Sequence, residues 1–116
     1  MADWRVQEVD NETRSRDINE IADANLEHPG GSATNNYVCE CSDGSCMATV
    51  DLTQDEYEQV RAHGARFVVA LDHENPEIDL LIAEHEGFAV VRKLPGFPAR
   101  LARASDPRRT SLERGT

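Results

Sequence analysis

The chain has 116 residues, of which 39% are hydrophobic and only six are aromatic, so we expect one domain with a small, mostly aliphatic core. The formal net charge of −10 argues against a general nucleic-acid binder, because the phosphate backbone would be repelled over most of the surface. The start of the sequence has no apolar run typical of a secretion signal, and no stretch approaches the roughly 20 apolar residues that cross a membrane. We therefore expect a cytoplasmic protein that does not enter the membrane.

Charge is unevenly distributed along the chain. Residues 1–91 carry 20 acidic and 5 basic side chains, whereas residues 92–116 carry 7 basic and 2 acidic ones. This change predicts a single domain over residues 1–94 and a basic, flexible tail containing Pro and Arg over residues 95–116. The acidic surface is a candidate site for another protein. The tail could be solvated, dock on an acidic face of this chain or of a partner, or contact nucleic acid.

The first predicted helix covers about residues 12–27, after a polar start that is either frayed or an edge strand. Its apolar side chains recur at helical spacing and predict that the buried face consists of Ile18, Ile21, Ala22 and Leu26. The His-Pro-Gly-Gly sequence at residues 28–31 ends this helix.

All three cysteines, Cys39, Cys41 and Cys46, fall within residues 37–47, a segment that we call the cysteine segment. Strands over 38–42 and 47–52 predict a hairpin, and Asp43-Gly44 between them favours a two-residue type I′ turn. This register places Cys41 opposite Cys46, and the alternation of a strand places Cys39 on the same face as Cys41. The polar residues between the cysteines indicate that the segment is exposed; they are Glu40, Ser42, Asp43 and Ser45.

A second helix begins with a capping box formed by Thr53 and Glu56, and Leu52 and Tyr57 can form a hydrophobic staple. It is expected to end near residue 62, and the β-branched and aromatic residues of 66–71 predict a strand.

Residues 76–86 fit two patterns. Helical spacing is slightly favoured, but alternation also allows a hairpin that turns at Glu86-Gly87, and residues 88–94 are a strand in either case. Together the elements predict an α+β fold: a small antiparallel sheet with a zinc-knuckle hairpin, an N-terminal amphipathic helix and one or two short helices.

The three cysteines in the pattern Cys-x-Cys-x4-Cys supply three soft ligands of a tetrahedral site. We expect His73, at the end of the 66–71 strand, to be the fourth, because that strand should pair in the same sheet as the hairpin. His63 and His85 are alternatives, whereas His28 lies in a loop well upstream. The prediction is therefore a Zn²⁺ ion bound by Cys39, Cys41, Cys46 and His73.

Two other interpretations of the cysteines remain open: reduced thiols in or near the core, and a redox-active bridge between Cys41 and Cys46. Catalysis is not expected, because four protein ligands leave no position for a substrate or water. The sequence also has no Cys-x-x-Cys pair, serine-protease-like constellation or phosphate-binding glycine loop. We therefore expect a non-enzymatic protein.

The sequence of residues 37–93 resembles a family of small actinobacterial proteins of unknown function. The resemblance rests on Cys-Glu-Cys-Ser-Asp-x2-Cys, Leu-Thr-x2-Glu-Tyr-Glu-x-Val-Arg, Arg-Phe-Val-Val-x3-His and Phe-x-Val-Val-x-Lys. Members of that family tend to have Pro-Gly before the histidine, where this chain has Leu71-Asp72. The resemblance implies a zinc-knuckle-like domain and no particular activity.

Overall fold

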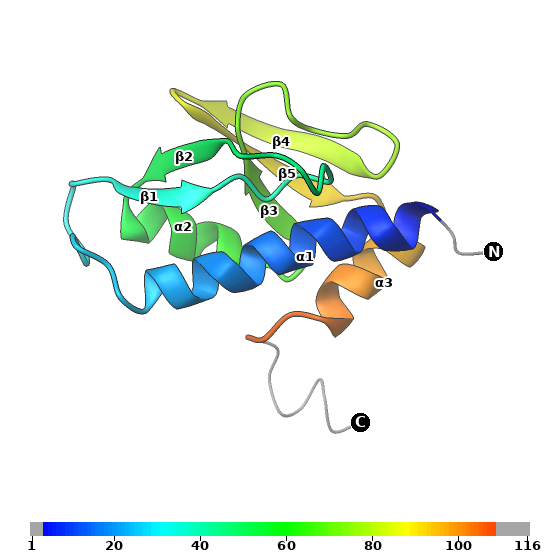
Figure 1. The fold of residues 1–116 in the computed structure, drawn as a ribbon, viewed down its shortest axis with the longest axis horizontal. Coiled ribbons are helices and arrows are strands. Elements are labelled where there is room, and N and C mark those ends of the chain that lie inside the picture. Colours follow the sequence, from blue (N-terminus) through cyan, green and yellow to red (C-terminus); the bar gives the residue numbers. More distant parts are fainter. Residues whose placement is uncertain (1–3, 109–116) are drawn as a thin grey trace.

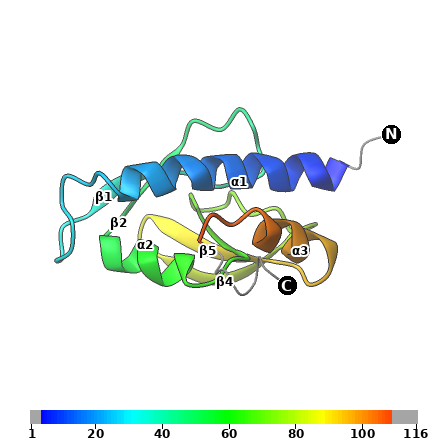
Figure 2. The same cartoon turned by 90° about the horizontal axis from the view of Figure 1, so that it is seen from below.

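A computed structural model describes residues 4–108 and confirms the α+β class. The elements in chain order are α1 (Trp4–Asp23), β1 (Asn35–Val38), β2 (Thr49–Leu52), α2 (Gln54–Arg61), β3 (Arg66–Val69), β4 (Asp79–His85), β5 (Phe88–Lys93) and α3 (Phe97–Ala104). Helix α1 lies along one side of the strands, next to α3, and α2 lies on the other side (Figures 1 and 2). Within the described residues, no helix has the length and apolar character needed to cross a membrane.

The strands form two antiparallel sheets rather than the single sheet that was predicted. One sheet has the order β1-β2 and the other the order β3-β5-β4. The central strand β5 is apolar on both faces because both faces are covered: Phe88, Ala89, Val90 and Val91 are all buried. The β3 strand is therefore in a different sheet from the β1-β2 hairpin. The expectation that these strands pair in one sheet, which favoured His73 as the fourth ligand, was wrong.

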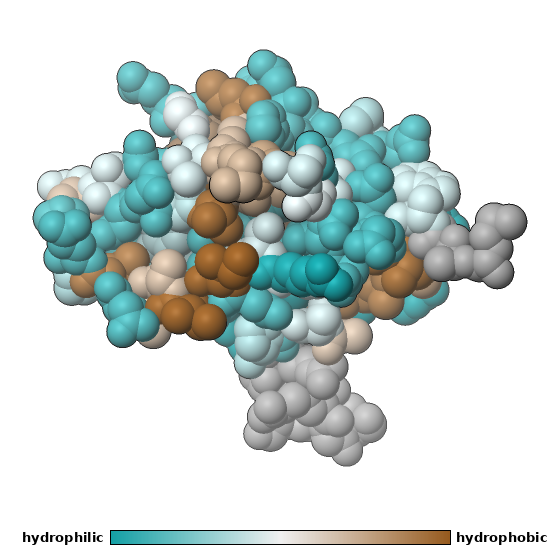
Figure 3. Space-filling model, in the orientation of Figure 1, coloured by the Kyte–Doolittle hydropathy of each residue, from teal (hydrophilic) through white to brown (hydrophobic). Residues whose placement is uncertain are grey.

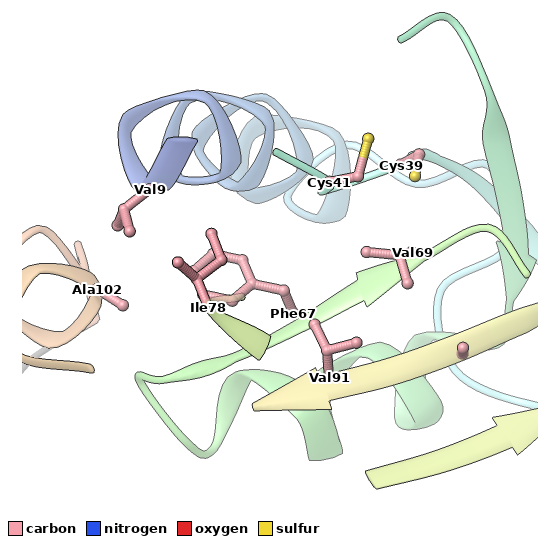
Figure 4. Packing of buried hydrophobic residues seen from close by; sticks show 9 residues of the cluster. Val9, Cys39, Cys41, Phe67, Val69, Ile78, Val91 and Ala102 are labelled. Atoms are coloured by element: carbon pink, nitrogen blue, oxygen red, sulfur yellow. The ribbon is translucent and has the colours of Figure 1, made fainter. Parts of the chain in front are cut away.

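The core consists of two hydrophobic clusters, one on each face of the three-stranded sheet. The first joins Val9 of α1 and Ala102 of α3 to alternate residues of the sheet and to Cys39 and Cys41 (Figure 4). The second lies between this sheet, α2 and the β1-β2 pair, where the rings of Tyr37 and Tyr57 stack with their centroids 4.4 Å apart. Two cysteines of the candidate site are thus part of the core.

Helix α1 differs from the prediction in its start and in its buried face. It begins at Trp4, and its buried residues are Val9, Glu12, Thr13, Arg16 and Asn19. Ile18 and Ile21, which were predicted to be buried, are 54% and 69% exposed. Hydrophobic spacing was misleading because the buried polar side chains of α1 have specific partners. Arg16, for example, donates to the carbonyl oxygens of Gly64 and Ala102 at 2.8 and 2.9 Å.

Helix α2 confirms the predicted start. Thr53 Oγ1 accepts a hydrogen bond from the Glu56 N–H at 3.1 Å, and Glu56 Oε1 accepts one from the Thr53 N–H at 2.8 Å. Leu52 and Tyr57 are both fully buried, as a staple that fixes the entry of the chain into the helix requires.

Residues 79–85 form strand β4, so the slight preference for a helix over residues 76–86 was wrong and the alternative hairpin is correct. The turn lies at Glu86-Gly87, where Gly87 has a φ of 93°. A β-bulge between Leu81 and Ala83 interrupts the pairing with β5. The pattern was ambiguous because residues 80–82 are three consecutive apolar residues, which fit both a helical and an alternating spacing.

The segment predicted as a tail contains a packed helix. Helix α3 buries Ala99 and Ala102, and just after it Asp106 forms an ion pair with the buried Arg61 of α2. Arg108 binds Glu58 through both terminal nitrogens, at 2.8 and 2.7 Å. The basic segment therefore docks on an acidic face of its own chain, at least as far as Arg108; residues 109–116 lie outside the described part.

Candidate metal centre

The cysteine segment forms the loop between β1 and β2. The ladder pairs Asn35 with Leu52 through Val38 with Thr49, which is the predicted register, and a hydrogen bond from the Cys39 N–H to the Ala48 carbonyl at 3.0 Å continues it. Beyond this bond the two sides separate. The three cysteines therefore lie in a loop and not on paired strands, and the prediction of a strand over residues 38–42 is correct only at its start.

The turn of this loop lies one residue later than predicted. The Cys46 N–H donates to the Asp43 carbonyl at 3.1 Å, so Gly44 and Ser45 occupy the centre of the turn. Neither Asp43 nor Gly44 has the positive φ of a type I′ turn. Asp43 Oδ1 instead accepts hydrogen bonds from both the N–H and the hydroxyl of Ser45, at 2.9 and 2.8 Å, which stabilises this alternative turn.

Helix α1 also holds the loop in place. Asn11 Nδ2 donates to the carbonyl of Ser42 at 2.8 Å. A Cβ atom at Gly44 would lie 3.3 Å from the Asn11 side chain, so the glycine allows the loop to approach the helix closely. The hydroxyl of Ser42 accepts a hydrogen bond from Asn75 Nδ2 at 3.2 Å, which links the loop to the segment that follows His73.

The structure brings all four predicted ligands together: Cys39, Cys41, Cys46 and His73. Their ligand atoms all lie within 4.8 Å of one another, and all three cysteines are free thiols. His73 Nδ1 lies 3.6 Å from Cys39 Sγ and 3.5 Å from Cys46 Sγ. We call these four residues the Cys3His cluster. They form a possible metal site.

Two backbone groups point at the sulfur atoms of this cluster. The Ala70 N–H donates to Cys39 Sγ at 3.2 Å, and the Ala48 N–H donates to Cys46 Sγ at 3.4 Å. Such hydrogen bonds stabilise negative charge on sulfur and fix its orientation toward a metal. Cys39 and Cys41 are buried, Cys46 is partly buried and His73 is exposed, so the cluster lies at the edge of the core.

The pKa values of the neighbouring thiols shift in opposite directions. A hydrogen bond with Cys39 lowers the pKa of the Cys41 thiol to about 5, whereas the same hydrogen bond, together with burial, raises the pKa of Cys39. Burial also raises the pKa of Cys46. A bound cation would replace the shared protons, because only the thiolate is a metal ligand.

Glu40, between two of the cysteines, is a residue whose role sequence reasoning missed. It was expected to be exposed, but it is fully buried, and burial raises the pKa of its carboxyl group. Its Oε2 accepts hydrogen bonds from Asn19 Nδ2 and the Tyr57 hydroxyl at 2.8 and 2.9 Å, and its Oε1 accepts one from the Val68 N–H at 3.0 Å. Nothing in the local sequence distinguishes this carboxylate from an exposed one.

The same residue joins the cysteine loop to the strand that leads to His73. The Glu40 N–H donates to the Val68 carbonyl at 2.8 Å, so both its backbone and its side chain bind Val68 of β3. Ala70, which donates to Cys39 Sγ, follows two residues later in the chain. Glu40 therefore holds the loop with three thiols next to the strand that leads to the histidine, although the loop and that strand are parts of different hairpins and sheets.

The other histidines occupy separate places. His85 stacks on Phe88 at the end of β4, with the ring centroids 4.6 Å apart, and His63 is exposed after α2. The cluster contains His73 alone.

The fold and this cluster define an α+β domain with a possible metal site of three cysteines and one histidine. Comparison of the chain with protein-family models, with curated proteins and with solved structures found no match. The resemblance to small actinobacterial proteins thus stays a prediction from the sequence motifs.

The residue before His73 has an unusual backbone conformation. Asp72 has a φ of 67°, the left-handed region that glycine adopts most easily. Replacing Asp72 with Gly should stabilise the protein by up to about 1 kcal/mol, because the relief of about 1–2 kcal/mol of strain exceeds the entropy that glycine adds to the unfolded chain.

Chemical denaturation of metal-loaded protein would measure this gain, and Asp72→Ala is the matched control, expected to be less stable than Asp72→Gly. A glycine variant that is less stable than the original chain would show that the Asp72 side chain itself supports the loop.

Proposed function

We propose that this chain is a non-enzymatic binding module whose fold is held by a Zn²⁺ ion at the Cys3His cluster. The observation that carries the proposal is the geometry of the cluster. In a tetrahedral zinc site with Zn–S near 2.3 Å and Zn–N near 2.1 Å, neighbouring sulfur and nitrogen ligands lie about 3.6 Å apart. His73 Nδ1 lies at 3.6 and 3.5 Å from the sulfur atoms of Cys39 and Cys46.

The ligand set favours zinc and a structural role. Three thiolates and one imidazole suit Zn²⁺, which takes four Cys or His ligands in structural sites. Four protein ligands complete a tetrahedron and leave no open position for water or a substrate, which argues against a catalytic metal. The ion would then connect the β1-β2 loop to the segment after β3, in addition to the hydrogen bonds of Cys39 and Ser42 with that segment.

A protein partner is the binding target that the surface supports best. The net charge of −10 gives the surface a negative potential that would attract a basic partner. On the face that Figure 3 shows, hydrophobic side chains form patches within a largely hydrophilic surface, and the exposed hydrophobic residues of the protein include Ile18 and Ile21 on α1. Nucleic acid is a weaker candidate, because the guanidinium of Arg108 is engaged by carboxylates of its own chain.

Metal analysis tests the proposal directly. Protein purified without added zinc should contain one zinc ion per chain by elemental analysis, and substitution with Co²⁺ should give the absorption spectrum of a tetrahedral thiolate complex. The Cys46→Ser variant, which keeps the loop but loses one thiolate, should bind the metal much more weakly. Metal well below one ion per chain would reject the proposal, and stoichiometric iron would reject zinc.

A thiol switch is the second candidate, because the sulfur atoms of the three free cysteines lie within 4.8 Å of one another, and two of them could form a disulfide bond. Mass spectrometry after mild oxidation separates the two functions. A switch requires a reversible Cys41–Cys46 bridge in the protein as purified, whereas a structural zinc site should protect all three thiols until the metal is removed.

A further inference from the structure

Three ionisable side chains from separate elements, none of them a member of the Cys3His cluster, meet inside the core. Lys93 is the last residue of β5, and its Cα is paired directly with that of Asp79, the first residue of β4. The Nζ atom of Lys93 contacts Oδ1 of Asp79 and Oε1 of Glu12, which comes from α1. The side chains are buried almost completely, with exposed fractions of 0% for Lys93 and Glu12 and 1% for Asp79.

The surroundings of this triad are apolar. The ring of Phe67 lies below the ammonium group, with its centroid 5.4 Å from Lys93 Nζ. Val9, one turn before Glu12, and Ile78, next to Asp79, belong to the same hydrophobic cluster (Figure 4). The three ionisable side chains are therefore held against each other in a region of low dielectric constant.

The charges of the triad do not balance. One ammonium group faces two carboxylates, so full ionisation would leave an excess negative charge in the core, where it is costly. Burial raises the pKa of Glu12 well above its ordinary value, against the opposing effect of Lys93, and the neighbouring Asp79 raises it further. Burial of this carboxyl group therefore favours its protonated form. A protonated acid beside an amine and a second carboxyl group is the arrangement that general acid–base catalysis needs.

We propose that Lys93 and Asp79 condense into an intramolecular isopeptide bond and that Glu12 is the catalytic residue. The bond forms between Lys93 Nζ and Asp79 Cγ, and one Cγ–O bond of Asp79 breaks. Of the three protons of the ammonium group, one stays on the new amide and two leave with the oxygen as water. One proton of the ammonium group first passes to the Asp79 carboxylate, which gives a neutral amine and a carboxylic acid. The amine nitrogen attacks Cγ, the protonated Glu12 donates its proton to the hydroxyl that leaves as water, and Glu12 then accepts a proton from Nζ, so it is regenerated. The reaction needs no oxidant, metal or cofactor.

The environment also favours the product. Condensation replaces a buried ammonium and a buried carboxylate with a neutral amide and releases a water molecule to solvent, which removes the cost of two desolvated charges. Proximity supplies the remaining requirement, because the folded chain holds the nucleophile and the carboxyl group in contact. The cross-link joins β4 to β5 and is independent of the metal proposed for the Cys3His cluster.

The test is the intact mass of the wild-type protein, measured after denaturation and reduction so that any metal is removed. We expect a mass lower than that of the sequence by one water molecule. Lys93→Arg, which keeps the positive charge, and Glu12→Gln, which keeps the size of the side chain, should both show the full sequence mass. A wild-type protein with the full mass overturns the proposal, and a Glu12→Gln variant that still loses water overturns the role of Glu12.

Tryptic mapping locates the missing water. Asp43-Gly44 could also lose one water by forming a succinimide, so the mass alone does not identify the site. The isopeptide bond protects Lys93 from trypsin and should yield residues 67–92 joined to residues 93–100 as one branched peptide. Unlinked peptides from these two ranges, or a water loss confined to the peptide with Asp43, would overturn the proposal.

Discussion

Replacing His73 with Ala is expected to lower the melting temperature of the zinc-loaded protein by more than about 10 °C, because it removes one of the four ligands of the proposed ion, which would connect the β1-β2 loop to the segment after β3. Structural zinc contributes about 10–16 kcal/mol to the folding of small zinc-finger peptides, and a domain of this size is stable by only about 5–15 kcal/mol. Loss of the proposed ion would thus remove a large share of the total stability. Thermal unfolding followed by circular dichroism, with and without a strong chelator, measures the effect.

The design of the experiment separates loss of the metal from loss of a side chain. His73 and His63 are both exposed, so His63→Ala is the matched control and should leave the melting temperature within about 2 °C of the wild type. The chelator should destabilise the wild type and His63→Ala but should have little further effect on His73→Ala. Equal melting temperatures for the wild type with and without chelator would contradict a structural metal, even if one ion per chain is bound.

Replacing Glu40 with Ala is expected to cost about 3–5 kcal/mol of stability, a cost typical of a buried charged group whose partners are left unpaired. The change leaves donors of Asn19, Tyr57 and Val68 without their acceptor in the core. It also removes the side-chain contact that holds the cysteine loop against β3. We therefore expect weaker metal binding as well, even though Glu40 is not a ligand.

Urea denaturation at saturating zinc measures the stability, and a competition titration against a chelator measures the affinity. Glu40→Gln keeps the size of the side chain but turns an NH2 group toward donors, so it should be intermediate. The control is Glu86→Gln in the exposed β4-β5 turn, which should change neither quantity. A Glu40→Ala variant with wild-type metal affinity would show that the loop reaches its position without this contact.

Local signals predicted the elements whose structure is decided by neighbouring residues. The capping box of Thr53 and Glu56 was confirmed because its hydrogen bonds are made within one turn. The hairpin register before Cys39 was confirmed because strand pairing continues from residue to residue. The turn at Asp43 was misplaced because a side-chain hydrogen bond competed with the expected turn type.

Signals that depend on distant partners were misleading. The buried face of α1 could not be recognised, because Arg16 and Asn19 are buried by virtue of partners far away in the chain. The segment over residues 97–104 was expected to be flexible, yet α3 packs on α1, and its two buried alanines are too small to give a strong hydrophobic signal. Strand β4 resembled a helix because its three consecutive apolar residues, 80–82, fit both spacings.

The sequence by itself determined the chemical character of the candidate metal site: three thiols within eight residues and a histidine after an apolar strand. Only the tertiary structure decided that these four side chains meet, because the thiols lie in the β1-β2 loop and the histidine lies in the segment after β3. It also decided what holds them together, namely a buried Glu40 that binds β3 and an α1 helix that holds the loop through Asn11. Ligand type is a property of single residues, whereas convergence depends on how distant parts of the chain pack.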